Sequence, residues 1–298
     1  MAQNKISFKW LVQKEKNASF CIGTSQNSTI AVDWGDGQSK VFNCSGAGSS
    51  LPYYYQVEKD KIYKTGHKYS SKGEYQVTVL IENSGSISFI NGYNRLCELN
   101  VSNAPDLAAL NCGGNLILKT LDVSNNVALK YLRCAYCCDL KELNLARNVE
   151  LEILDCENCY LTSLDVSKNV LLKELICWVN QLDELDISKN VNLVVLDCYN
   201  NQLTNLDISK NVLLNTLNCG HNQLDELDVS KNVNLEYLNC SRNKLTRLDL
   251  TNNIELCELD CSNNQLKTLD LSKHSRLIKL VCDGNEFKSL VELFNQHK

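Results

Sequence analysis

The chain has 298 residues and a formal charge of −5 at pH 7, and 44% of its residues are hydrophobic and 22% charged. This composition can bury a sizeable core and is too apolar for a disordered protein. The acidic balance excludes the broad basic field with which proteins attract nucleic acid, and no run of about 18 apolar residues is present to insert into a membrane. With 4 His and 1 Met, the chain offers little for imidazole acid–base chemistry.

Residues 1–88 predict a small β-sandwich. Ile6, Phe8, Trp10 and Val12 alternate with polar residues, and residues 76–81 form a second strand pattern. Clusters of Gly, Ser and Asn separate such runs, as turns separate strands.

Two motif blocks in this region suggest a family. Ala31-Val-Asp-Trp-Gly-Asp-Gly37 is followed by His67-Lys-Tyr69 and Gly73-Glu-Tyr-Gln-Val-Thr-Val79. Together they resemble the polycystic kidney disease (PKD) domain, an immunoglobulin-like (Ig-like) sandwich common in bacterial surface proteins. Residues 43–55 depart from that pattern.

The resemblance assigns structural roles to the motif residues. It implies that Trp34 lies in the core, that residues 35–37 form a hairpin turn and that Tyr75 lies in a strand. His67 is expected to be a turn histidine or a packing histidine rather than a catalytic one. The domain as a whole is expected to cover the amino-terminal end of the array that follows, because a repeat array needs a cap over its last apolar layer.

Residues 89–298 contain a repeat that accounts for most of the 16 cysteines. Nine cysteines are separated by 22, 22 and then six steps of 21 residues. Each stands within the pattern Leu-x-x-Leu-x-Cys-x-x-Asn-x-Leu-x-x-Leu-Asp-Val-Ser-x-Asn. A fixed period of this length predicts a solenoid. The nine are Cys112, Cys134, Cys156, Cys177, Cys198, Cys219, Cys240, Cys261 and Cys282.

From Leu96 to Leu290 the repeat resembles bacterial leucine-rich repeat proteins with short nested units. The resemblance implies a short strand in each unit, with leucines facing inward and the intervening residues lining a concave parallel sheet. Period-two alternation agrees, since it separates Leu196 and Cys198 from Val195 and Tyr199. The fold class expected is therefore mainly β: an Ig-like sandwich followed by a leucine-rich repeat solenoid of about nine repeats, in which cysteine is a small buried hydrophobe.

Two polar columns accompany the repeat. One asparagine column should turn inward and bond backbone groups that no sheet ladder reaches; it comprises Asn180, Asn201, Asn222, Asn243, Asn264 and Asn285. The aspartates of a second column, each followed two residues later by Ser or Thr, predict turns on a solvated face with a neutralising Lys row. Calcium binding is the alternative, but the glycine-rich loops of calcium solenoids are missing. This column is Asp165, Asp186, Asp207, Asp228, Asp249 and Asp270.

Two repeats carry Cys-x-x-Cys pairs, Cys134 with Cys137 and Cys156 with Cys159. Their spacing would suit zinc, but the first cysteine of each pair belongs to the inward column, so the spacing alone does not establish a metal site and none is assigned. Cys137 and Cys159 occupy equivalent positions in adjacent units. Free thiols, a disulfide and a zinc site all remain open for them, and pairing of Cys21 with Cys44 is undecided as well.

A patch of apolar and aromatic side chains is the candidate ligand-binding site. Its residues take the outward positions around the repeated cysteine and should face solvent on the concave surface, where Trp and Tyr commonly anchor partners. They are Tyr131, Ile153, Ile176, Trp178, Val195 and Tyr199. Beyond the last repeat, Phe287, Leu290, Val291, Leu293 and Phe294 have helical spacing and predict a carboxy-terminal cap.

These features predict a non-enzymatic binding protein without a cofactor. The sequence contains no glycine-rich phosphate loop, nucleophile elbow or His-carboxylate metal cluster. Resemblance to internalin-like proteins implies a surface or secreted bacterial adhesion module, extracellular and monomeric, that recognises a protein or a glycan. The alternative is an intracellular scaffold or delivered effector for protein–protein interaction. The unpaired thiols and the lack of a secretory signal at residues 1–10 favour that alternative.

Overall fold

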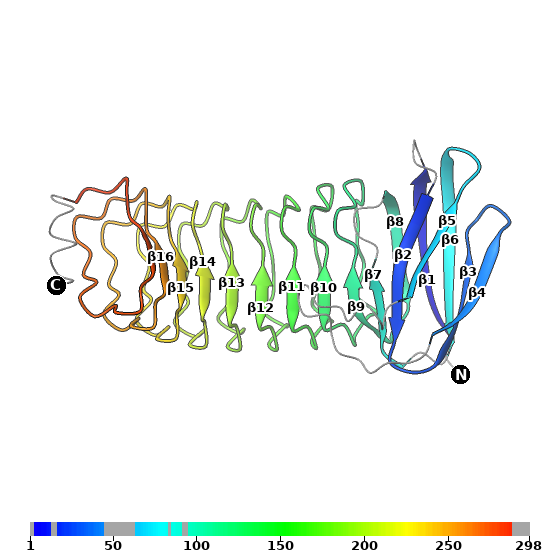
Figure 1. The fold of residues 1–298 in the computed structure, drawn as a ribbon, viewed down its shortest axis with the longest axis horizontal. Coiled ribbons are helices and arrows are strands. Elements are labelled where there is room, and N and C mark those ends of the chain that lie inside the picture. The colour runs from blue at the N-terminus through cyan, green and yellow to red at the C-terminus, as the bar shows by residue number, and fades with distance from the viewer. Residues whose placement is uncertain (1–2, 13–16, 45–62, 83–84, 91–94, 288–298) are drawn as a thin grey trace. The chain divides into compact units, whose positions relative to one another are not determined.

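The computed structural model describes residues 3–12, 17–44, 63–82, 85–90 and 95–287, in which all regular elements are β-strands (Figure 1). The chain divides into two compact units, Met1–Leu161 (unit 1) and Thr162–Lys298 (unit 2), which we describe separately. None of the described segments is a helix that could cross a membrane.

Unit 1 begins with an antiparallel sheet of five strands. The predicted alternation is confirmed in its central strand, where Ile6, Phe8, Trp10 and Val12 are all buried and paired with the strand of residues 73–82. In spatial order the strands are β4 (Ser39–Cys44), β3 (Ser28–Asp33), β6 (Gly73–Glu82), β1 (Asn4–Val12) and β8 (Leu96–Asn103).

The other strands of the amino-terminal region join the sheet of the first repeats. β7 (Ile87–Ile90) pairs antiparallel with β2 (Asn17–Thr24) and parallel with β9 (Leu107–Asn111), so that Phe89 lies beside Leu110. An isolated sandwich would leave this strand edge unpaired, whereas here the first coil hydrogen-bonds to it. No separate Ig-like sandwich domain is therefore evident, contrary to the expected fold class. In spatial order the strands are β5 (Tyr63–Lys68), β2 (Asn17–Thr24), β7 (Ile87–Ile90), β9 (Leu107–Asn111), β10 (Tyr131–Arg133) and β11 (Ile153–Asp155).

Aromatic rings pack between these two layers. The ring of Phe8 in β1 lies 5.6 Å from that of Phe20 in β2 and 5.7 Å from that of Phe89 in β7. Trp34, 2% exposed, packs 5.7 Å from Phe20, so its predicted place in the core is confirmed. Large tilted and edge-on ring pairs of this kind stabilise a core beyond the area they bury.

The turn predicted at residues 35–37 is also confirmed. β3 and β4 pair on either side of it, and the Trp34 amide donates to the Gln38 carbonyl at 3.0 Å. Gly35 and Gly37 have φ angles of 76° and 85°, which glycine adopts at little cost. The His67 ring stacks 5.2 Å from Trp34 and its Nε2 lies 2.7 Å from an Asp36 carboxylate oxygen, so it has the packing role expected of it.

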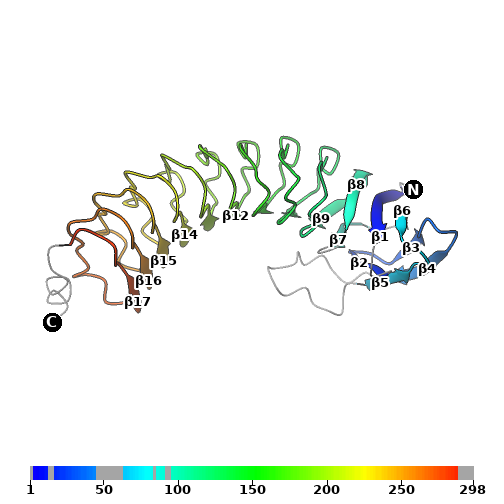
Figure 2. The ribbon, with the colours of Figure 1, turned by 90° about the horizontal axis from the view of Figure 1, so that it is seen from above.

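Each repeat forms one coil that contributes one short strand. In unit 2 these strands pair in parallel and in register, with Leu196, Leu217 and Leu238 side by side and fully buried. Figure 2 shows the strands along the inner side of this unit's row of coils. They are β12 (Glu174–Ile176), β13 (Val195–Asp197), β14 (Thr216–Asn218), β15 (Tyr237–Asn239), β16 (Glu258–Asp260) and β17 (Lys279–Val281).

The predicted inward cysteine column is confirmed. The repeated cysteines from Cys112 to Cys261 are 0% exposed, and only Cys282, in the last described coil, is half-buried. Burial raises the pKa of the thiols of Cys156, Cys198, Cys219, Cys240 and Cys261, and for Cys261 it raises the pKa to about 12. The thiols therefore behave as small neutral hydrophobes between layers of leucine.

The predicted asparagine column holds adjacent coils together. Asn201 Nδ2 donates to the carbonyls of Cys177 and Cys198, each at 3.0 Å, while its Oδ1 accepts the Leu182 amide at 3.1 Å. The same three bonds to backbone groups of two adjacent coils recur at Asn222, Asn243, Asn264 and Asn285. The inward orientation expected from the sequence is confirmed.

A second buried asparagine ladder was not predicted. Asn211 Nδ2 donates to the carbonyls of Ile187 at 3.1 Å and Asn190 at 2.8 Å, and its neighbours repeat this pattern. The signal was present in the sequence as the second Asn of the repeat pattern. The fully buried members in unit 2 are Asn169, Asn190, Asn211, Asn232 and Asn253.

His274 takes the place of asparagine in the last step of this second ladder. It is 3% exposed, and neither ring nitrogen has a hydrogen-bond partner within the described residues. His274→Asn should let an amide donate to the carbonyls of Leu250 and Asn253, as Asn253 does one coil earlier to Val229 and Asn232. We expect about 1–3 kcal/mol of added stability, measured by amide hydrogen exchange in the last coils.

The converse variant, Asn253→His, is the matched control and should lose comparable stability. Faster exchange in His274→Asn than in the parent would contradict this account of the ladder. Of the residues of the predicted carboxy-terminal cap, Phe287 lies within the described part of the chain and the others lie outside it.

Candidate functional site

The strand face is the surface formed by the outward side chains of the coil strands and by the residue after each repeated cysteine. In unit 1 it is closed rather than exposed. Tyr131 and Ile153, predicted to face solvent, are only 6% and 8% exposed and form a buried cluster with Ala109. The three occupy one register position in β9, β10 and β11. Because parallel strands lie about 4.8 Å apart, the ring of Tyr131 covers its neighbours.

Beside this cluster lies an ion-pair network that the sequence analysis missed. Arg133 Nε lies 2.7 Å from an Asp155 oxygen, and a terminal guanidinium nitrogen lies 3.1 Å from Glu157. The side chains of Asp155, Glu157 and Arg133 are 0%, 8% and 20% exposed, so both carboxylates are desolvated and paired. Opposite charges at outward positions of adjacent repeats were the available signal.

In unit 2 three of the four patch residues have the solvent exposure expected of them. Ile176 is 8% exposed, contrary to expectation, whereas Trp178, Val195 and Tyr199 are partly exposed. Period-two alternation places Ile176 on one face between Glu174 and Trp178, and these longer side chains can cover it. Exposed members of the predicted patch therefore occur only in unit 2.

A row of polar side chains runs along the same face and was also missed. The row takes the position before the repeated cysteine and, within unit 2, comprises Asp197, Asn218, Asn239 and Asp260. Asn239 Oδ1 accepts both the amide and the hydroxyl of Ser241, the latter at 2.7 Å. Asp260 accepts the same two hydrogen bonds from the amide and the hydroxyl of Ser262, and Asp197 accepts the Tyr199 amide at 3.1 Å. The sequence signal was an Asp or Asn two residues before a Ser.

Aromatic rings flank this polar row. The rings of Tyr199 and His221 lie 5.8 Å apart, tilted by 51°. Burial and the nearby carboxylates of Asp197 and Asp260 raise the pKa of the half-buried Tyr237. The strand face of unit 2 thus combines aromatic surface with many oxygen acceptors, which suits recognition rather than acid–base chemistry.

Cys137 and Cys159, which replace the asparagine of the first ladder, make one of its hydrogen bonds to the preceding coil. Cys137 Sγ donates to the Cys112 carbonyl at 3.3 Å, and Cys159 Sγ donates to the Cys134 carbonyl at 3.1 Å. Asn201 and its equivalents make this same bond to the preceding coil. All sixteen cysteines, Cys21 and Cys44 included, are free thiols, and the described residues contain no group of three or more His, Cys, Asp or Glu side chains arranged to hold a metal.

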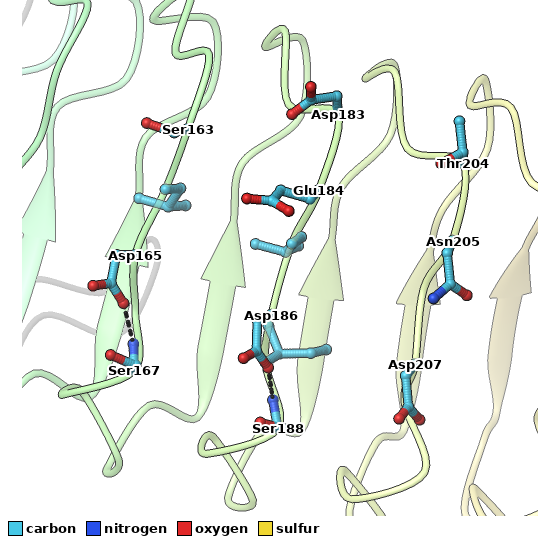
Figure 3. Close-up of a pocket in the computed structure, with 13 residues that line it drawn as sticks. Ser163, Asp165, Ser167, Asp183, Glu184, Asp186, Ser188, Thr204, Asn205 and Asp207 are labelled. Carbon is cyan, nitrogen blue, oxygen red and sulfur yellow. Dashed lines mark hydrogen bonds between the residues drawn. The ribbon is translucent and has the colours of Figure 1, made fainter.

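The aspartate column lies along a groove of unit 2 away from the strands. Figure 3 shows Asp165, Asp186 and Asp207 at one position on three successive coils. Asp165 accepts the Ser167 amide at 2.9 Å, and this bond holds the pKa of the carboxyl below its usual value. Each aspartate of this column makes the same bond to the residue two positions later, so the predicted turn role is confirmed.

Aliphatic side chains also gather on a turn outside the strand face. We call this row the Val ridge; in unit 2 its members are between 44% and 48% exposed. Each directly follows a buried asparagine of the second ladder, which fixes its spacing. The Val ridge consists of Val170, Val191, Val212, Val233 and Ile254.

Solved structures show what this arrangement is similar to. The functional domain of InlJ from Listeria monocytogenes, described as including a cysteine ladder, aligns with a TM-score of 0.62 and 30% identity over 68% of this chain and 55% of its own. The repeat array is a solenoid of stacked parallel strands like that of leucine-rich repeat proteins. A leucine-rich repeat protein of Leptospira interrogans aligns with a TM-score of 0.54 and 22% identity over 66% of this chain and 60% of its own.

Across most of the chain the structural neighbours are internalins and other leucine-rich repeat proteins. The leucine-rich repeat domain of APL1B has a TM-score of 0.52 and 23% identity, over 61% of this chain and 56% of its own. The chain therefore spans between 55% and 60% of the length of the InlJ, Leptospira and APL1B structures. No family model and no curated protein matches the chain.

Proposed function

We propose that this leucine-rich repeat chain is a non-enzymatic protein-binding module that holds its partner on the strand face of unit 2. The single observation that carries the proposal is that the partly exposed side chains of Trp178 and Tyr199 lie on the same surface as the polar row. Large aromatic side chains beside polar groups are typical of interface anchors. The likeness to leucine-rich repeat structures, the InlJ functional domain among them, supports a protein-interaction module, so we take the partner to be a protein rather than a glycan.

Adhesion or host interaction at a bacterial surface is the biological setting that we propose. It rests on the likeness to the InlJ domain and on the PKD-like motif, whose core tryptophan and glycine turn suit a cap at the start of the array. An intracellular scaffold remains the second candidate. The observation that favours it is the set of sixteen free thiols, because reducing compartments preserve thiols.

The binding proposal can be tested without knowing the partner in advance. The intact chain is first applied to protein and glycan arrays, and the dissociation constant of the strongest hit is then measured by calorimetry. The double variant Trp178→Ala with Tyr199→Ala should weaken binding of a protein hit at least tenfold, because two buried aromatic anchors each contribute about 1–2 kcal/mol.

A matched control removes apolar surface elsewhere on the same coils. Val191→Ser with Val212→Ser changes two members of the Val ridge and should leave the dissociation constant unchanged. Equal loss in both double variants, or no loss in the aromatic one, would reject the strand face as the site. Binding of glycans alone would reject the protein partner.

A further inference from the structure

One coil of unit 2 lacks the serine hydroxyl that donates a hydrogen bond to the polar row in the coils after it. In the next two coils, the side-chain oxygens of Asn239 and Asp260 each accept a serine hydroxyl at 2.7 Å. Asn218 has Gly220 in place of that serine. Its Oδ1 is buried and has no hydrogen-bond partner within the residues that the structure describes. An unpaired buried acceptor costs free energy that a donor from outside could recover.

Gly220 also shapes the surface around this oxygen. A Cβ atom at Gly220 would lie 2.9 Å from Asn239 Oδ1 and 3.1 Å from both Ser241 Oγ and Tyr199 Cδ2. The ring of Tyr199 therefore extends over the glycine and uses the space that a side chain would fill. On binding, a rotation of this partly exposed ring would open space beside Gly220, and side-chain rotations of this kind are common in complexes.

The site formed by Asn218, Gly220 and Tyr199, which we call the notch, is surrounded mainly by hydrogen-bond acceptors. Asp197 lies one coil before Asn218 at the same register position, and Asn239 lies one coil after it. Tyr237 stands near Asp197 and Asp260, whose carboxylates act on its hydroxyl. Of the neighbouring basic side chains, Lys279 pairs with Glu258 at 3.2 Å, the His221 ring lies 5.8 Å from that of Tyr199 at a tilt of 51°, and Arg242 is exposed. A ligand that brings several donors and a positive charge would complement this surface.

We infer that the notch around Asn218, Gly220 and Tyr199 is a subsite for an arginine side chain of the protein partner. A guanidinium is planar, carries five donors and no acceptor, and stacks on aromatic rings. It can donate to Asn218 Oδ1 and to the Asp197 carboxylate while lying against the Tyr199 ring. An ammonium group lacks the flat shape for this stacking, so arginine is preferred to lysine. The inference rests on the proposed function and names the chemistry of its partner.

The test uses the intact chain and blocked amino acids as probes. N-acetyl-arginine amide is titrated while the backbone amide signals are followed by NMR, with the matching lysine and citrulline compounds as comparisons. Shifts should centre on Gly220 and Tyr199, and citrulline, which has nearly the same shape but no charge, should bind at least tenfold more weakly. Equal binding of arginine and citrulline would overturn the inference.

Gly220→Ser supplies the decisive variant, because serine is the residue at this position in the next two coils. Its hydroxyl should satisfy Asn218 Oδ1 and fill the notch, so arginine binding should fall at least tenfold. Val212→Ser introduces serine on the Val ridge of the same coil and should change nothing. If Gly220→Ser fails to fold, Asn218→Ala removes the oxygen without adding an atom and should also weaken arginine binding.

Failure of this inference is distinguishable from failure of the proposed function. If Gly220→Ser and Asn218→Ala both bind arginine as the parent does, the subsite is rejected. The protein hit from the arrays still tests the strand face through the single variant Trp178→Ala, because Trp178 is not part of the proposed arginine subsite and loss of binding in this variant does not depend on that subsite. Replacement of each arginine in that hit by lysine should identify one position where affinity falls.

Discussion

Raising the pH above about 9 should sharply reduce the free energy of unfolding. Burial raises the pKa of the thiols of Cys198, Cys219 and Cys240 well above the usual value, whereas in the unfolded chain a cysteine titrates near 8.5. Their contribution to stability is therefore complete below about pH 8.5 and is lost as the pH rises toward the folded pKa. Each thiol removes about 1.4 kcal/mol per pH unit in that window. Urea unfolding at a series of pH values measures the slope.

A triple variant assigns the slope to the cysteine column. Replacing Cys198, Cys219 and Cys240 with alanine should reduce the slope by about 4 kcal/mol per pH unit, since three titrating groups are removed. At pH 7 the same variant reports only the lost packing, because the thiols are then protonated in both states. An unchanged slope in the triple variant would show that other groups cause alkaline unfolding.

The repeated features of the fold were predictable because each is stated many times in the sequence. One leucine or cysteine can face inward or outward, but a residue that recurs every 21 positions must do the same in every coil. The inward positions of Leu196, Cys198 and Asn201 follow from this and are confirmed by their burial. The Gly35 to Gly37 turn was predictable for a different reason, because glycine supplies backbone angles that other residues avoid.

Features that depend on lateral neighbours were not predictable in this way. The alternation that places Tyr131 and Ile153 on the same face is correct, but the alternation cannot show that they are buried there in a cluster with Ala109. The pairing of β7 with β9 joins residues 87–90 to residues 107–111, and no periodic signal links the two. The unpaired Asn218 oxygen likewise depends on a missing serine, which becomes visible only when neighbouring coils are compared.

Asn243→Ala should be among the most destabilising single substitutions in unit 2. The amide of Asn243 donates to the carbonyls of Cys219 and Cys240, each at 3.1 Å, and its Oδ1 accepts the Leu224 amide at 3.0 Å. Alanine would leave three buried backbone groups of successive coils without this partner. At about 1–3 kcal/mol for each buried group left unpaired, a total loss of about 3–5 kcal/mol is expected after relaxation. Chemical denaturation measures the loss.

The chain itself supplies the matched control for this prediction. Cys137 and Cys159 occupy the asparagine position in two coils of unit 1 and keep one bond, from sulfur to the carbonyl of the preceding coil. Asn243→Cys should therefore retain the equivalent bond to Cys219 and lose less stability than Asn243→Ala. Hydrogen exchange should show the weakened coupling on both sides of the altered coil, because each coil is stabilised mainly by its neighbours. Equal stability of the alanine variant and the parent would mean that leucine packing alone holds adjacent coils together.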